Sequence, residues 1–215
     1  MLYQVTGDQK YKEAMDKLEG FFQSAFNRSS GTFVTGKKFS GGQWIDDGNF
    51  ATDVQMWAIL VLGVDTVDQW FGEGTALRML EETKKQSGVF DGPALQGFDF
   101  TNYRRLGRSA IVSVEWTAFS AFAFEEAANF YSATRPDAAQ SLLRDAQSMD
   151  AYLAPLAVDV DGTTAYPYAT GSGAMSSRPT GLGWNIPPQE VLSLSASSWM
   201  VLRKLGFNPF LLGGK

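Results

Sequence analysis

The sequence predicts an all-α fold of three helical hairpins, in a single domain that covers residues 1–215. Three charged amphipathic segments alternate with three mostly apolar segments, and long glycine- and aromatic-rich loops separate them. Apolar residues spaced three and four apart are typical of a helix with one buried face, whereas an apolar run without a polar face is typical of a helix wrapped by others. The alternation therefore predicts outer amphipathic helices around inner apolar ones.

The outer helices are expected over residues 8–28, 73–86 and 136–153. The stripe of the first comprises Tyr11, Ala14, Leu18, Phe21 or Phe22, and Ala25. The stripe of the third comprises Ala139, Leu142, Leu143, Ala146, Met149 and Leu153. Pro136 suits the first turn of a helix, where its missing N–H is not needed. The loops that follow these helices are long enough to form short strand pairs.

The inner helices are expected over residues 51–63, 111–131 and 190–206. The middle one, IVSVEWTAFSAFAFEEAANFY, is apolar or small at almost every position from Val112 to Phe124. Glu115 lies inside that run, where an ionised carboxylate costs several kcal/mol unless it is paired or faces water. Glu115 is therefore the strongest functional candidate in the sequence.

Matched residues indicate that the three hairpins are an internal repeat. Gly31, Gly88 and Gly162 each follow an amphipathic segment. Trp57, Trp116 and Trp199 each lie in the apolar segment that comes next. Loop insertions account for the uneven spacing between units.

Composition excludes several classes of function. The net charge of -5 argues against nucleic acid as a partner, because such binding draws its affinity from Lys and Arg on phosphates. The chain has no cysteine and no histidine, which excludes disulfides, histidine bases and zinc sites built from these residues. No run approaches the roughly 20 apolar residues of a membrane span, so we expect no membrane insertion and a soluble chain. The sequence does not determine the compartment, nor whether a signal peptide originally preceded these residues.

Four segments give the chain a resemblance to the α/α toroids, in particular to the six-hairpin glycosidase superfamily. They are TDVQMWAILVLG (52–63), SVEWTAFSAFAF (113–124), AYPYATG (165–171) and SLSASSWMVLRKLGFNPF (193–210). The resemblance implies two rings of helices, with glycans bound at the N-terminal ends of the inner ring. Three hairpins resemble half of that toroid, so we expect an incomplete α/α toroid. The bare flanks of a half-ring predict a homo-oligomer or the remainder of a larger polypeptide.

Glu115 and Asp53 are the candidate catalytic pair, because both are expected near the start of inner helices that point the same way. Glycoside hydrolysis needs two carboxyl groups, about 5 to 5.5 Å apart in retaining enzymes and about 6.5 to 9.5 Å apart in inverting ones. We expect Glu115 to be the protonated acid and Asp53 to stay ionised. Two alternatives stay open: Asp53 as a helix cap, and Glu115 as a buried carboxylate tied to a loop amide or an arginine. The arginines in question are Arg104, Arg105 and Arg108.

Loop residues supply the candidate substrate-binding set. These are Trp44, Asp99, Tyr103, Tyr166, Tyr168 and Trp184. Aromatic faces stack on sugar rings, although such side chains also serve as lids over a core. The other loop acids match ordinary turn chemistry, and no stretch has the ligand spacing of a calcium loop. We therefore expect neither a metal nor a cofactor.

Two functions remain after this reasoning. The first is a carbohydrate-active hydrolase that acts on an oligosaccharide or polysaccharide through the Glu115 and Asp53 pair. The second is a non-catalytic module that binds a glycan or another protein. Both require loop aromatics, but only the first requires two carboxyl groups that face one site.

Overall fold

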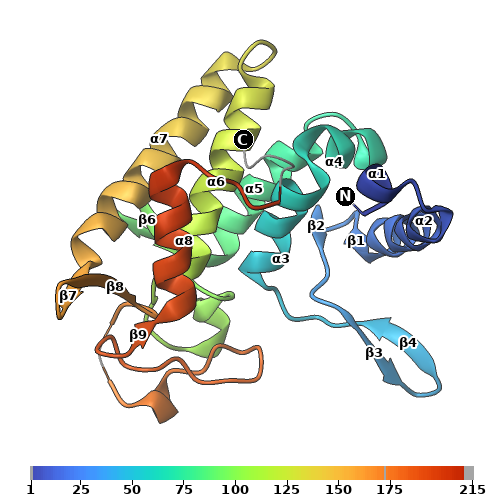
Figure 1. Cartoon of the computed structure of the whole chain (residues 1–215). Coiled ribbons are helices and arrows are strands. Elements are labelled where there is room, and N and C mark those ends of the chain that lie inside the picture. The colour runs from blue at the N-terminus through green and yellow to red at the C-terminus, as the bar shows by residue number, and fades with distance from the viewer. Residues whose placement is uncertain (1, 172, 211–215) are drawn as a thin grey trace.

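The computed structural model describes residues 2–171 and 173–210, and it shows a mixed α/β chain (Figure 1). Helices take up 53% of this described part and strands 17%. Its nine strands form four small antiparallel sheets, so the predicted all-α class is wrong, and the incomplete toroid of helices alone is corrected with it. The sheets form because the loops contain β-branched and aromatic residues next to glycines that reverse the chain.

The helices of the described part occupy both predicted and unpredicted segments. The α-helices are α1 (Leu2–Thr6), α2 (Gln9–Ala25), α3 (Thr52–Trp57), α4 (Val64–Phe71), α5 (Thr75–Ser87), α6 (Val114–Tyr131), α7 (Pro136–Leu153) and α8 (Leu194–Leu205). A π-helix, η1 (Ala58–Leu62), continues α3. Short 3-10 helices are η2 (Tyr103–Leu106), η3 (Ala154–Leu156) and η4 (Met175–Ser177). The amphipathic patterns correspond to α2, α5 and α7, and the apolar patterns to α3 with η1, α6 and α8.

The strands form four hairpins and one added strand. They are β1 (Phe26–Asn27), β2 (Thr32–Phe33), β3 (Lys37–Ser40), β4 (Gln43–Asp46), β5 (Gly88–Asp91), β6 (Ala94–Phe98), β7 (Val158–Val160), β8 (Thr163–Pro167) and β9 (Leu192–Ser193). The pairs β1–β2, β3–β4, β5–β6 and β7–β8 are antiparallel, and β9 joins β8. The β3–β4 hairpin projects from the body of the molecule (Figure 1).

A unit of outer helix, β-hairpin and inner helix occurs three times. The outer helices α2, α5 and α7 lead into the hairpins β1–β2, β5–β6 and β7–β8, and each unit ends in α3, α6 or α8. The same hydrogen bond ties hairpin to inner helix in all three units. The donors are the N–H groups of Phe33, Phe98 and Tyr166, and the acceptors are the side chains of Gln55, Thr117 and Ser197, at 2.9, 3.0 and 2.9 Å. Each acceptor is the fourth residue of its helix.

The observed units correct two of the residues matched by sequence. The turn of the second hairpin contains Gly92 rather than Gly88. The turn glycines with positive φ are Gly31, Gly92 and Gly162, at 71°, 55° and 80°. The sixth residues of the inner helices are Trp57, Phe119 and Trp199. Phe119, and not Trp116, is therefore the counterpart of the other two aromatic residues.

Helix α6 is the centre of the core. Its N-cap is Ser113, whose Oγ accepts the N–H of Trp116 at 3.3 Å. Almost all of the helix is buried, because α7, α8 and α3 pack around it. None of the described helices has the length and apolarity that crossing a bilayer requires. The packing around α6 fixes the first turns of α3, α6 and α8 relative to one another.

Candidate functional site

The N-terminal ends of α3, α6 and α8 lie at the same end of the molecule, beside the loops (Figure 1). The second residue of each of these helices is polar. These residues are Asp53, Glu115 and Ser195. Because the three units repeat the same hydrogen bond two residues further on, the three side chains occupy equivalent positions. They form a row across the first turns of the inner helices.

Asp53 is half-buried in the first turn of α3, and its Oδ1 accepts the N–H of Val54 at 2.9 Å. The N-cap of the helix is Ala51, so Asp53 does not have the capping position. Burial, and to a smaller degree the charge of Glu115, raises the pKa of Asp53 to about 6. At pH 7 Asp53 is therefore still mostly ionised, and it takes up a proton as the pH falls through about 6.

Glu115 is half-buried, because the N-terminal end of α6 opens towards the loops. Its Oε2 accepts a hydrogen bond from Ser195 Oγ at 2.7 Å. Ser195 Oγ lies 3.0 Å from Ser193 Oγ, which in turn accepts the N–H of Ala196 at 3.2 Å. The ion pairs among the described residues leave Glu115 without an arginine, so the alternative of an Arg104, Arg105 or Arg108 partner does not apply. Glu115 is therefore fixed by the first turn of α8.

Aromatic rings pack beside Glu115. Phe100 stacks on Tyr168 with 5.6 Å between ring centroids, and Trp116 meets Phe100 edge-on at 4.7 Å. Trp184 contacts both Phe100 and Trp116, and its Nε1–H donates to the Tyr168 hydroxyl at 3.0 Å. Burial, with a smaller contribution from the charge of Glu115, raises the pKa of Tyr168. Trp184 is exposed, so it offers a ring face to solvent next to the carboxyl pair.

Of the six predicted substrate-binding residues, the structure brings Tyr168 and Trp184 to this row. Asp99 is fully buried and pairs with Arg108, whose two Nη atoms lie 2.7 Å from its two oxygens. Asp99 also accepts the N–H of Ile111 at 2.9 Å. Its aromatic neighbours in sequence are buried in the core, which takes Asp99 inside with them. Asp99 therefore has a structural role.

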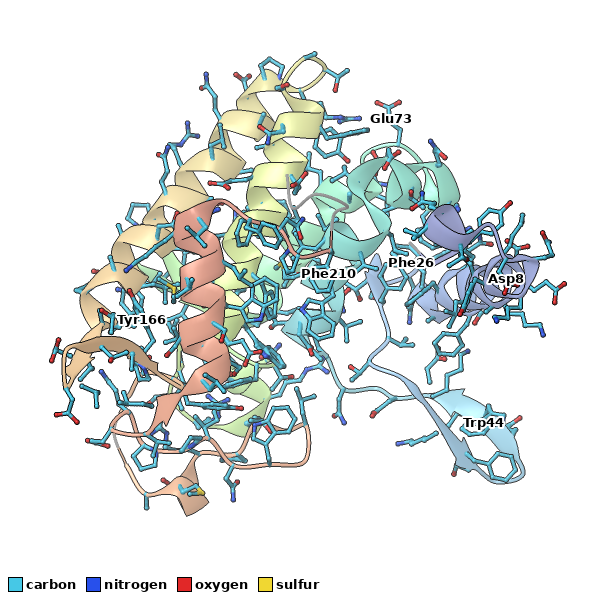
Figure 2. All side chains as sticks on the ribbon, viewed as in Figure 1. Asp8, Phe26, Trp44, Glu73, Tyr166 and Phe210 are labelled. Carbon is cyan, nitrogen blue, oxygen red and sulfur yellow. The ribbon has the colours of Figure 1, made fainter. Side chains whose placement is uncertain are left out.

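Tyr166, Trp44 and Tyr103 also lie apart from the row. Tyr166 is a buried residue of β8 and packs beside α8 (Figure 2). Trp44 is exposed on the projecting β3–β4 hairpin, far from α6 (Figure 2), and packs against Phe39 with 5.5 Å between centroids. Tyr103 is half-buried in η2, and the Arg104 guanidinium lies 4.5 Å above its ring. Tertiary packing separates these rings because their loops belong to different sides of the fold.

Sequence reasoning did not identify Ser195 as a member of the site. Its signal lies in the alignment of TDVQMW, VEWTAF and LSASSW, which places Asp53, Glu115 and Ser195 at the same position. The register is visible only once Phe119 replaces Trp116 as the matched aromatic. Phe100 has the same loop setting in the sequence as the predicted aromatic residues, but the structure buries it beneath Tyr168 and Trp184.

Asp53 and Glu115 belong neither to a metal-binding cluster of the described residues nor to the lining of five surface cavities. The described residues contain no group of three or more Asp or Glu side chains that could hold a metal ion. Five cavities on the described surface have neither Asp53 nor Glu115 in their lining. Both carboxyl groups are instead half-buried in the first turns of their helices.

Comparison of the chain with protein-family models, with curated protein sequences and with solved structures gave no match. The site is therefore interpreted from its own geometry.

Proposed function

We propose that the row of Asp53, Glu115 and Ser195 is a carbohydrate-processing site of the glycoside hydrolase type. The observation that carries the proposal is the pair of carboxyl groups in unlike surroundings: Asp53 has a pKa raised to about 6, and Glu115 accepts a serine hydroxyl. Two carboxyl groups whose environments differ are the usual means of dividing acid and base roles. The exposed ring of Trp184 is a surface on which a sugar ring can stack.

In the proposed reaction Asp53 gives its proton to the oxygen that leaves the glycosidic bond. Glu115 accepts a proton from the water that attacks the sugar carbon, so that one C–O bond forms as the other breaks. Ser195 keeps the Glu115 carboxylate in one orientation. An acid that acts in its protonated form loses activity as the pH rises through its pKa, so hydrolysis is expected to fall above about pH 6.

The test is a panel of oligosaccharides that differ in sugar and linkage, with new reducing ends as the readout. Asp53→Asn and Glu115→Gln are each expected to lower the rate by about 10² to 10⁴-fold. Asp137→Asn is the matched control, because Asp137 is also in a first helical turn but is exposed on α7. Absence of hydrolysis across the panel, or full activity in both site variants, would refute the hydrolase.

The second candidate is a module that binds a glycan without cleaving it. The exposed ring of Trp184 favours this candidate, because an aromatic face can bind a sugar ring without any carboxyl chemistry. Titration calorimetry separates the two functions. Trp184→Ala is expected to weaken oligosaccharide binding about tenfold in either case. Binding that Asp53→Asn leaves unchanged, without any new reducing ends, would establish the binding module.

A further inference from the structure

The three outer helices carry apolar or small residues at the same spacing, but their burial differs. In α7 the stripe is Ala139, Leu142, Leu143, Ala146, Met149 and Leu153, and all of it is buried except Leu143, which is 37% exposed. In α5 the corresponding residues are Ala76, Leu80, Thr83 and Ser87, which are buried as well. In α2 they are Tyr11, Ala14, Leu18, Phe21 and Ala25, of which Ala25 alone is buried. Leu18 is 56% exposed and Phe21 49% exposed.

The difference follows from the position of each outer helix in the repeat. Helix α7 lies against α6, the inner helix of the preceding unit, and α5 lies against α3. For α2, no preceding inner helix is present among the described residues. Figure 1 shows α2 at the right edge of the molecule and α8 in the left half, in front of α6. By analogy with α5 and α7, the stripe of α2 is a surface on which an inner helix would pack. The described residues do not supply that helix.

The inner helix of the third unit, α8, exposes the face that the other two inner helices bury. In α6, the first, fifth and eighth residues are Val114, Ala118 and Ala121, which are buried. Val114 and Ala118 pack in one cluster with side chains of α7 and α8. In α3 and its continuation η1, the corresponding residues are Thr52, Met56 and Ile59, also buried.

In α8, the corresponding residues are Leu194, Ser198 and Val201, and all three are exposed. Leu205, one helical turn further along, extends the same stripe. Leu194 is 85% exposed and Leu205 72% exposed. In the first two units, this face of the inner helix meets the unit that follows.

A groove between α2 and α3 lies where the repeat places a preceding inner helix. Helix α6 contacts both α7 and α8, so the equivalent helix for the first unit must contact both α2 and α3. The groove there has a volume of about 390 Å³ and an almost wholly apolar lining. Its walls include Phe21 and Phe22 of α2, Val54 and Trp57 of α3, and Val61 of η1. Its occupant must therefore present a helix with an apolar face.

We propose that α8 of a second copy of this chain occupies this groove, in a head-to-tail contact that repeats the packing of α6 against α7 and α8. The chain carries both complementary surfaces, the groove at its first described unit and the exposed face of α8 at its third, so a second copy supplies the fitting partner. Repeat arrays usually cover their terminal repeats with polar faces, whereas the described α2 and α8 expose apolar residues. The contact is heterologous, since each copy contributes two different surfaces.

Cross-linking tests the contact cleanly, because the chain has no cysteine of its own. Leu18→Cys and Val201→Cys are prepared as separate proteins and treated with a short bis-maleimide. A covalent pair is expected only when the two proteins are mixed. A covalent pair from either protein alone would indicate a symmetric contact and overturn the head-to-tail arrangement. Gln23→Cys, exposed on the opposite side of α2, is the control and should not cross-link to Val201→Cys.

Light scattering gives an independent result. The native chain is expected to have the mass of two or more copies, and Phe21→Asp or Val201→Asp alone to raise the dissociation constant at least about tenfold. Mixing these two variants should restore a pair, because each retains the surface that the other has lost. Circular dichroism checks that both variants are folded. A native monomer at every concentration, or a mixture that stays monomeric, would overturn the proposal.

Discussion

Ser195 Oγ donates a hydrogen bond to Glu115 Oε2 across 2.7 Å, which joins the first turns of α8 and α6. The two residues are 80 positions apart in sequence, and each is the second residue of its helix. The contact therefore links equivalent points of two repeated units. It also limits the orientations that the Glu115 carboxylate can take.

Ser195→Ala is expected to lower the free energy of unfolding by about 0.5 to 1.5 kcal/mol, since it removes one hydrogen bond to a carboxylate. Ser198→Ala, on the exposed face of the same helix, is the control and should change stability by less. Urea unfolding followed by tryptophan fluorescence measures both. Equal effects of the two substitutions would contradict a role for the Ser195 hydroxyl.

Asp53 is expected to make stability depend on pH. Its pKa is raised from 3.8 to about 6 by folding, so the folded chain binds more protons between these values and its unfolding free energy falls as the pH rises. Asp53→Asn removes this fall. Relative to the native chain, the unfolding free energy of the variant should therefore rise by about 1 to 3 kcal/mol between pH 4 and pH 7. Urea unfolding at four pH values checks this, and a constant difference between the two proteins would contradict it.

The buried pair of Asp99 and Arg108 is expected to matter for stability and not for ligand binding. Asp99→Ala leaves the Arg108 guanidinium buried without its partner, at a cost of about 3 to 5 kcal/mol. The double variant Asp99→Leu with Arg108→Met should lose less than the sum of the single variants, because it removes both charges. A double-mutant cycle in urea measures the coupling. Strictly additive losses would show that the two charges act independently.

Three equivalent hydrogen bonds join a hairpin to an inner helix. We expect the one to α6, at the centre of the core, to cost the most stability when it is removed. Thr117→Val keeps the shape of the side chain but leaves the buried N–H of Phe98 without its acceptor, at about 1 to 3 kcal/mol. Ser120→Ala, also buried on α6, is the control. Its hydroxyl donates to the Trp116 carbonyl of the same helix, so its loss leaves that carbonyl its backbone partner. Thermal unfolding of both variants gives the comparison.

The helices could be predicted because their signals are local. Helix α7 begins at Pro136 and ends at Leu153, as the apolar spacing of residues 136–153 indicates. The sequence also contained the repeat, but its register was set wrongly by Trp116, which is the nearest tryptophan and not the equivalent residue. The fold class was wrong for a related reason: strands of two to five residues leave too short an alternation of apolar and polar residues to stand out in a loop.

The site was only partly predictable. Asp53 and Glu115 could be selected because a carboxylate in an apolar helix is costly wherever the helix lies. Which loop aromatic residues accompany them depended on where each loop returned to the core, and that placed Trp184 beside Glu115 and Trp44 at the end of a projecting hairpin. No local pattern distinguishes those two tryptophans.

By itself, the sequence determined the order of outer and inner helices, the absence of cysteine and histidine chemistry, and the two carboxylates that belong to the first turns of α3 and α6. These follow from side-chain spacing and composition, which act within a few helical turns. Only the tertiary structure decided that burial raises the pKa of Asp53, that Ser195 completes the row, and that α2 and α8 expose apolar faces. These properties depend on burial and on contacts between residues far apart in the chain, and neither exists until the units pack together.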